Sequence, residues 1–192
     1  KESKYLTIGY HGSSSHLKRL EDGFVQAVNF LITEKSFNFK LKVITENNNF
    51  AQSVISDLGL NINSIDFNNW SVKNIVKFMN SIDIGVVPNN KILENKFDDF
   101  NNGLYFSDYT LRFKNKSNPG RAFVYIQFGI PVIADLTPSM LPLYFDEKCG
   151  YIANNKESYI YALRKLGSVT ERAEKAKNAI ARFNDLYSIE ED

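Results

Sequence analysis

The stretch KSNPGRAFVYIQFGIPVIAD, residues Lys116 to Asp135, decides the fold of this 192-residue chain. Asn118 followed by Pro119 predicts a helix start, because an asparagine side chain accepts hydrogen bonds from free backbone amides and a proline at the first helical position loses none. The helix predicted over Gly120 to Phe128 is apolar on nearly every face. A helix of this kind has to be buried on most of its sides.

A strand is predicted directly after this helix. Gly129 ends the helix, as a residue that readily takes a positive φ. Ile130 to Ala134 is then a short β-branched run with Pro131 at its edge. Such a run is typical of a strand covered on both faces in a parallel sheet. The stretch is therefore a tight helix-to-strand unit of an α/β fold.

The start of the predicted helix is also a candidate anion site. Lys114, Lys116 and Arg121 flank it. The free amides of Ser117 to Arg121 and the positive end of the helix dipole lie at the same place, so a phosphate would be stabilised there by both. The same residues fit an ordinary helix cap with solvated lysines, since short motifs also occur by chance.

Short strands alternate with amphipathic helices in the first half of the chain. In chain order, the sequence predicts strand 5–10, a helix carrying Leu17 to Leu31, strand 41–45, helix 50–58, strand 62–67, helix 71–80 and strand 82–87. Ser71 caps the last of these helices, and its Val72, Ile75, Val76 and Met79 are expected to face inward. This alternation predicts an open parallel sheet with right-handed crossovers and helices on both faces.

We expect one domain over residues 1–192, with an irregular insertion at about 89–115 and a C-terminal helix at about 168–188. The insertion is too aromatic for a flexible linker and is expected to be irregular or in short helices. It could serve as a lid or a subdomain contact, or pack over an exposed sheet edge. The chain begins at Lys1 and enters a strand almost at once, which suggests a segment of a longer protein.

Composition excludes several functional classes. The net charge of +1 gives no overall field that would attract nucleic acid or an anionic membrane. A single cysteine, Cys149, excludes an internal disulfide and suits a reducing, cytoplasmic location, and two histidines argue against a zinc site. We expect no metal. The sequence shows no signal peptide and no apolar run approaching a membrane span.

In an open parallel sheet, ligands bind beyond the carboxyl ends of the strands, where the strand order reverses. Three segments are expected to meet at that edge: His11 to Lys18, the residues from Pro88 onward, and Lys116 to Arg121. Gly12 allows close approach of the backbone, the serines after it offer hydroxyls and amides, and Lys18 adds charge, so together they could cradle a diphosphate. The loop is neither a dinucleotide fingerprint nor a P-loop.

Four segments, taken in order, resemble a known family. They are YLTIGYHGSSSHLKRL, INSIDFNNWSVKNIVKFMNSIDIGVVP, KSNPGRAFVYIQFGIPVIAD and GYIANNKESYIYAL. They are similar to the C-terminal, nucleotide-sugar-binding domain of group 1 glycosyltransferases with the GT-B fold. The most specific piece is GIPVIAD after an apolar helix. The resemblance covers nearly the whole chain and implies a Rossmann-like domain that binds the sugar donor.

The family implies a nucleoside-diphosphate sugar as substrate, no cofactor and no essential metal. It also implies a missing N-terminal Rossmann-like domain of the same protein, which holds the acceptor, a glycan or lipid-linked glycan, and could contact a membrane peripherally. No nucleic acid partner is implied. Transfer takes place in the cleft between the two domains, so this chain alone is expected to be inactive.

The resemblance also suggests individual site residues, with departures. The family's Gly-Arg-x4-Lys diphosphate loop falls on Gly12, Ser13 and Lys18, with Ser13 in place of the arginine. The family's two glutamates, separated by seven residues, fall on Lys116 and Val124, so both carboxylates and their usual contacts to ribose and donor sugar are missing.

The basic helix start would take over the phosphate charge in place of the missing family residues. The phosphate contacts expected there are Lys116, Ser117, Gly120 and Arg121. Trp70 and Ser71 fall where the family closes on the nucleobase, although Trp70 would equally suit core packing.

Two further readings stay open. The missing carboxylates would fit a non-catalytic module that kept the fold as a nucleotide-binding or structural half. A flavodoxin-like receiver domain is disfavoured, because a receiver carries acidic residues after its first strand, where this chain has His11, Gly12 and Ser13. His11 or His16 could act as a general base, but a hydrogen-bonded structural role is favoured for both.

Overall fold

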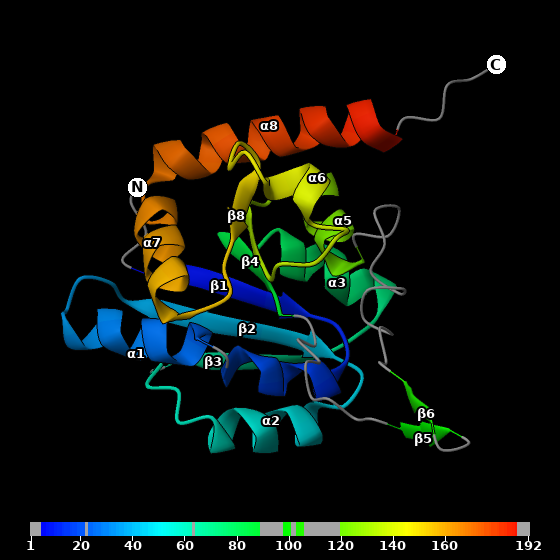
Figure 1. Ribbon diagram of the computed structural model, residues 1–192. Coiled ribbons are helices and arrows are strands. Elements are labelled where there is room, and N and C mark those ends of the chain that lie inside the picture. The colour runs from blue at the N-terminus through cyan, green and yellow to red at the C-terminus, as the bar shows by residue number, and fades with distance from the viewer. Residues whose placement is uncertain are drawn as a thin grey trace.

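The protein is an α/β domain built on a six-stranded parallel sheet (Figure 1). The computed structural model describes residues 5–21, 23–62, 64–88, 98–100, 103–105 and 120–187. The strand order is β3-β2-β1-β4-β7-β8, and each neighbouring pair is parallel. The strands are β1 (Leu6–His11), β2 (Phe39–Thr45), β3 (Ile65–Asn69), β4 (Ile84–Val87), β7 (Val132–Ala134) and β8 (Gly150–Ile152). The predicted open parallel sheet is confirmed.

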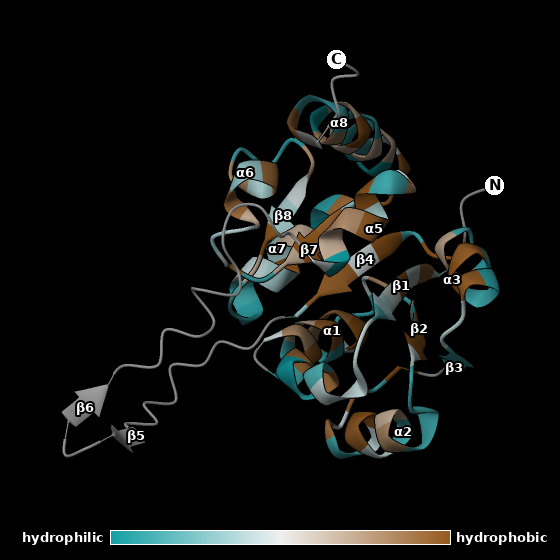
Figure 2. Ribbon diagram, turned by 90° about the vertical axis from the view of Figure 1, so that its right-hand side faces the viewer, coloured by the Kyte–Doolittle hydropathy of each residue, from teal (hydrophilic) through white to brown (hydrophobic). Residues whose placement is uncertain are grey.

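Helices cover both faces of the sheet, as predicted. One face carries the 3-10 helix η1 (Ser14–Glu21), α1 (Phe24–Thr33), α2 (Asn48–Asp57) and α7 (Lys156–Leu166). The other carries α3 (Val72–Met79), α5 (Arg121–Gln127), α6 (Leu141–Tyr144) and α8 (Val169–Tyr187). In Figure 2 the central strands β4 and β7 are largely hydrophobic and lie between helices that carry both hydrophobic and hydrophilic residues, whereas the edge strand β3 is hydrophilic.

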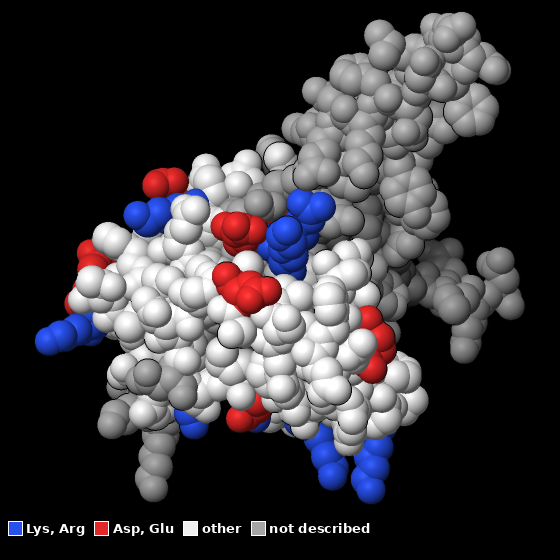
Figure 3. All heavy atoms as spheres, turned by 90° about the horizontal axis from the view of Figure 1, so that it is seen from below, with Lys and Arg blue, Asp and Glu red and all other residues white. Residues whose placement is uncertain are grey.

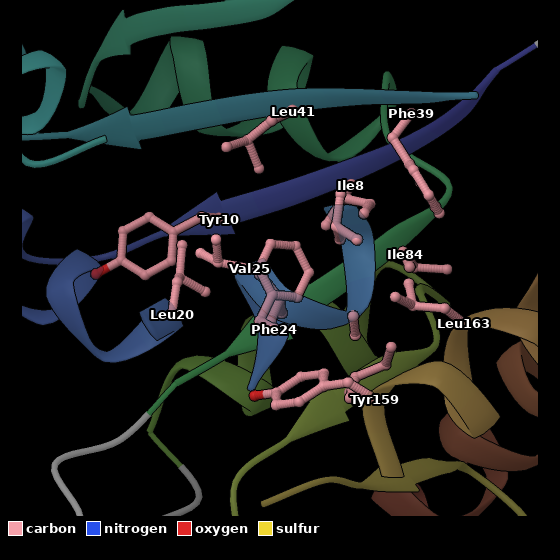
Figure 4. Close-up of a cluster of buried hydrophobic side chains, with 14 of the residues drawn as sticks. Ile8, Tyr10, Leu20, Phe24, Val25, Phe39, Leu41, Ile84, Tyr159 and Leu163 are labelled. Atoms are coloured by element: carbon pink, nitrogen blue, oxygen red, sulfur yellow. The ribbon is translucent and has the colours of Figure 1, made fainter. Parts of the chain in front are cut away.

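Each face has its own core, because successive side chains of a strand point to opposite sides. Ile133 of β7 joins the core on the α1 side, whereas Val132 and Ala134 join the core on the α5 side. Figure 4 shows side chains of β1, β2, α1 and α7 converging in the first core, among them Ile8, Tyr10, Phe24, Leu41, Tyr159 and Leu163. The sheet is therefore buried on both sides in its centre.

The strand order reverses between β1 and β4. The chain leaves β1 toward β2 and β3 on one side, then returns to place β4, β7 and β8 on the other. The crevice outside the carboxyl ends of β1 and β4 is thus the place where an open α/β sheet of this kind binds its ligands.

The first helical region is divided at Gly23, whereas the sequence predicted one helix carrying Leu17 to Leu31. Residues 14–21 form a 3-10 helix, and α1 begins only at Phe24. Gly23 has a φ of +119°, and a Cβ placed on it would lie 2.6 Å from the backbone carbon of Asn155. The break exists because the backbone packs directly against the start of α7.

Two other helix predictions need correction. In α3, Met79 is buried and Ile75 packs against the core as predicted, but Val72 is 71% and Val76 43% exposed, because the helix turns Phe78 to the core instead. Helix α5 begins at Arg121, one residue after the predicted Gly120, which is a non-helical N-cap of φ 57°; the predicted cap at Asn118 and Pro119 lies outside the described residues. Among the described residues, Gly120 and Arg121 therefore mark the beginning of this helix.

The insertion expected at 89–115 lies outside the described residues except for two short strands. These are β5 (Asp98–Phe100) and β6 (Gly103–Tyr105), which pair antiparallel. The described part is thus extended, not irregular or helical as expected. At the C-terminus, α8 follows the predicted helix closely. Among the helices described, none combines the length and apolarity needed to cross a bilayer.

We predict that Gly23→Ala destabilises the fold at least twice as much as Gly59→Ala. Both glycines have positive φ, which costs an L-residue about 1 to 2 kcal/mol. A methyl group on Gly59 meets nothing within 4 Å, whereas one on Gly23 also meets the backbone of Asn155 and Lys156. Urea unfolding of both variants measures the difference. Equal losses would contradict the direct packing of Gly23 on α7.

Candidate functional site

The site lies at the carboxyl ends of β1 and β4, where α5 begins. Arg121, the first residue of α5, donates a hydrogen bond from Nη2 to the carbonyl oxygen of Pro88, which follows β4. On the other side it lies against Gly12, which follows β1. A Cβ on Gly12 would be 2.5 Å from the Cδ of Arg121. The structure thus brings together Gly12 and Arg121, two residues that the sequence placed in one phosphate site.

The Arg121 guanidinium is enclosed but incompletely hydrogen-bonded. It lies over the Tyr10 ring, 5.3 Å from the ring centroid. Its Nη1 is buried and has no hydrogen-bond partner among the described residues. A buried charged donor without an acceptor lowers the stability of the fold. In native proteins such a donor usually has a functional role or binds a water molecule or an ion. Nη1 of Arg121 is therefore a donor that no acceptor among the described residues uses.

Tyr125 fixes α5 to the end of β1. Its hydroxyl donates to the carbonyl oxygen of Gly9 at 2.8 Å and accepts the backbone N–H of His11 at 3.1 Å. Its ring fills space that a side chain at Gly85 would occupy, since a Cβ there would lie 2.7 Å from the ring. The position of Arg121 one turn earlier on the same helix follows from this attachment.

His11 has a structural role at this site. Its Nε2 lies 3.0 Å from the carbonyl oxygen of Arg121, which can only accept, so Nε2 carries the hydrogen. The ring packs edge-on against Tyr125. Burial, together with the nearby Arg121 charge, lowers the pKa of His11 to about 4, although its hydrogen bond to Arg121 opposes the shift. A neutral, hydrogen-bonded imidazole of this kind is poorly suited to act as a general base near neutral pH.

Glu46, which the sequence did not single out, is hydrogen-bonded to the loop that follows Gly12. Its carboxylate accepts the Ser14 amide at 3.1 and 3.2 Å, the Ser14 hydroxyl at 2.9 Å and the Ser13 hydroxyl at 3.0 Å. It also accepts the Thr45 hydroxyl at 2.6 Å. Partial desolvation raises the pKa of Glu46, but the hydrogen bonds from Thr45 and Ser14 outweigh it and lower the pKa to about 2.

This contact could have been found from the register of the sheet. His11 pairs with Ile44 in the parallel ladder between β1 and β2. Continuing both strands by two residues places Glu46 opposite Ser13. The diphosphate loop expected at Gly12 to Lys18 is therefore already hydrogen-bonded to a carboxylate of the chain itself.

The other site residues predicted from the sequence differ in their exposure and in their local roles. Lys18 is exposed on η1. Trp70, which follows β3, is 55% exposed and so does not belong to the core. Ser71 caps α3, where its hydroxyl accepts the amide of Asn74 at 3.1 Å. Lys116 and Ser117 lie outside the described residues, and Gly120 is the N-cap of α5.

The charged side chains described on the face seen from below Figure 1 are of both signs. Figure 3 shows acidic and basic side chains interspersed there, in keeping with the net charge of +1. Within the described ranges, no three His, Cys, Asp or Glu side chains gather closely enough to hold a metal ion. The enclosed guanidinium of Arg121 is accordingly the feature around which we build the site.

Comparison with solved structures identifies the fold family. No family model and no curated protein matches the sequence. Among solved structures, WaaG, a glycosyltransferase involved in lipopolysaccharide biosynthesis, aligns with 97% of this chain at a TM-score of 0.63 and 16% identity. The chain has the fold of the C-terminal half of a GT-B glycosyltransferase. It spans 44% of the WaaG chain, less than half of that protein.

Two further GT-B structures support this assignment of the fold. The C-terminal domain of a group 1 glycosyl transferase, LpcC from Francisella tularensis, aligns with 96% of this chain at a TM-score of 0.60 and 16% identity, and 87% of that domain is covered. Anabaena HepE in complex with UDP-glucose aligns with 94% of this chain at a TM-score of 0.58 and 16% identity, with 44% of HepE covered. The GT-B fold that the sequence resemblance predicted is confirmed.

We predict that acid destabilises the protein through His11. Its folded pKa of about 4 lies below the unfolded value of 6.5, so between these pH values the unfolded chain binds a proton that the folded chain does not. The stability that neutral His11 contributes is complete above pH 6.5 and is lost as the pH falls toward 4. Between pH 7 and 4.5 this loss is about 2 kcal/mol.

Urea unfolding at both pH values measures the effect in three chains. His11→Gln should lose this part of the pH dependence, while His16→Gln, the matched control at the second histidine, should keep it. Identical pH dependence in the parent chain and His11→Gln would show that His11 is not held neutral.

Proposed function

We propose that this chain is the donor-binding domain of a glycosyltransferase, which transfers a sugar from a nucleoside-diphosphate sugar to a glycan or lipid-linked glycan. The single observation that carries the proposal is the enclosed Arg121 guanidinium beside Gly12, at the ligand-binding edge of a GT-B half. The missing acceptor of Nη1 fits a phosphate oxygen, since guanidinium and phosphate form charge-assisted bidentate pairs.

The chemistry we propose for the chain is mainly electrostatic. When the bond between sugar and phosphate breaks, negative charge grows on the leaving nucleoside diphosphate. A fixed guanidinium in a water-poor site stabilises that charge more in the transition state than in the ground state. No metal or cofactor is required in this account, and a general base would come from the acceptor domain or be absent in a retaining reaction.

The other contacts predicted from the sequence complete the proposed donor site. Lys18, Lys116 and Ser117 would add charge and hydrogen bonds to the diphosphate beside Gly12 and Gly120, whereas the Ser13 hydroxyl predicted to join them donates to Glu46. Trp70 would stack on the nucleobase, because an exposed tryptophan after a strand of this edge has its ring available. Ser71 would lie beside it as the cap of α3.

The rest of the protein is proposed from the family resemblance. A second Rossmann-like domain, N-terminal to this one, would hold the acceptor and could contact a membrane peripherally. The HepE structure containing UDP-glucose supports a nucleotide sugar as the ligand of the fold. We place the enzyme in the cytoplasm, as expected from its cysteine content.

A non-catalytic module is the second candidate. The departures at Lys116 and Val124 favour it, because the family's two glutamates are missing there. The Glu46 carboxylate in the Ser13 and Ser14 loop also favours it, since it takes donors that a diphosphate would use. The enclosed cation at Arg121 opposes it, as a purely structural half has no need of an unpaired guanidinium nitrogen.

We predict that one nucleoside diphosphate among UDP, GDP, ADP and CDP raises the melting temperature of this chain. A ligand at a hundred times its Kd adds about 2.7 kcal/mol, or about 5 to 10 °C for a domain of this size. Arg121→Ala should weaken binding about tenfold or more, because a hydrogen bond between charged groups is lost. Trp70, the one tryptophan of the chain, should change its fluorescence on binding if the base stacks on it.

Arg164→Ala is the matched control, since Arg164 pairs with Glu34 at 2.8 Å on the surface of α7. It should leave nucleotide binding unchanged. Binding that survives Arg121→Ala as well as Arg164→Ala would remove Arg121 from the donor site. No stabilisation by any of the four nucleotides would favour the non-catalytic module.

A further inference from the structure

The turn at Ser13 and Ser14 has hydrogen-bond donors of the kind that bind anions. The Glu46 carboxylate of the same chain accepts hydrogen bonds from these donors. Four donors surround the Glu46 carboxylate, three hydroxyls and one backbone amide, at distances of 2.6 to 3.2 Å. A phosphate accepts hydrogen bonds from the same kinds of donor. We propose that Glu46 occupies, from within the chain, a phosphate-binding site made by Ser13, Ser14 and Thr45, and so keeps a phosphate out of it.

The backbone of the turn is held in place by contacts that do not involve Glu46. Ser14 and Thr45 are 4% and 0% exposed. The Ser13 carbonyl oxygen accepts the Tyr10 hydroxyl at 2.5 Å and the His16 amide at 3.1 Å. The backbone of the turn therefore has contacts of its own, and the Ser14 amide and the buried Ser14 and Thr45 side chains should stay near their positions when the carboxylate is removed.

Glu46 has no acceptor capacity left for a ligand. Its Oε1 accepts three hydrogen bonds, and its Oε2 accepts the Thr45 hydroxyl and shares the Ser14 amide. A phosphate brought to the same donors would meet the negative charge of the exposed Glu46 carboxylate at contact distance, and like charges this close repel each other. Binding at this turn accordingly requires that Glu46 be neutral, displaced or absent.

This inference separates two parts of the edge that the sequence had joined. Arg121 and Gly12 form one part, where a guanidinium nitrogen is free of described partners. Ser13, Ser14 and Thr45 form the other, where Glu46 takes the donors. The ligand would be a nucleoside diphosphate only if the proposed function holds, but the occupied turn can be tested with an anion that carries no base or sugar.

Inorganic pyrophosphate is the probe. We expect Glu46→Ala to bind it about tenfold more tightly than the parent chain, because the hydroxyls and the amide then lack an internal acceptor. Glu46→Gln, which removes the charge but keeps the shape, should show a smaller gain. Both gains should shrink as salt is added. Calorimetric titration measures the affinity of each chain for pyrophosphate.

Glu174→Ala is the matched control for the change in net charge, since Glu174 is exposed on α8. Equal pyrophosphate affinity in the Glu46 and Glu174 variants would overturn the proposal and leave Glu46 as a plain loop contact. If Glu46→Ala does not fold, the affinity of Glu46→Gln for pyrophosphate is the test. An affinity equal to that of the parent chain would then also overturn the proposal. Adding Ser14→Ala to the better binder should reverse part of the gain.

The outcome is independent of the test of the proposed function. Nucleoside diphosphate binding that depends on Arg121, without a pyrophosphate gain in either Glu46 variant, would sustain the donor site and remove the occupied turn. A pyrophosphate gain in the Glu46 variants, with no nucleotide bound by the parent chain, would sustain the occupied turn and weaken the donor site.

Discussion

The insertion of Arg121 between the ends of β1 and β4 is the interaction on which the site depends. Its guanidinium bonds the carbonyl of Pro88 after β4 and lies against Gly12 after β1. A side chain at Gly12 would collide with it, so the close approach requires glycine at that position. Tyr125 holds the helix that carries Arg121 by two hydrogen bonds to β1. A positive charge is thereby held in place between β1 and β4, where the strand order of the sheet reverses.

The electrostatics of this edge rest on two opposite arrangements. Arg121 is a cation with an unused donor, enclosed beside Tyr10, whose pKa burial raises to about 12. Glu46 is an anion whose acceptors are all used by hydroxyls and an amide. The first has a donor left for an anionic ligand once its covering atoms move aside, whereas the second has no acceptor left. Any diphosphate bound here should therefore lie on the Arg121 side of Gly12.

The sequence predicted the architecture well, because periodicity reports burial directly. Alternating and continuous apolar runs placed the strands within a few residues, and the apolar helix before GIPVIAD correctly indicated a helix buried against the sheet. Features that depend on contacts between distant segments were missed. The break at Gly23 arises from packing on Asn155, and the exposure of Val72 and Val76 follows from how α3 docks on the sheet. The local sequence pattern shows neither the packing of Gly23 on Asn155 nor the way α3 docks on the sheet.

The candidate site was predicted in part. Gly12 and Arg121 were placed together correctly, since both follow from where parallel strands end. The helix that carries Arg121 begins one residue later than predicted, because Gly120 is its N-cap. Glu46 was overlooked because it stands in an asparagine-rich turn, which indicates only a loop. Only the register of β1 on β2 brings Glu46 to Ser13.

A crystal structure of this chain with the nucleoside diphosphate that stabilises it most would test the central claim most directly. The account predicts a phosphate oxygen within hydrogen-bond distance of the Arg121 guanidinium, beside Gly12, with Glu46 still bonded to Ser14. A diphosphate bound elsewhere, with Arg121 bonded to protein atoms alone, would contradict it.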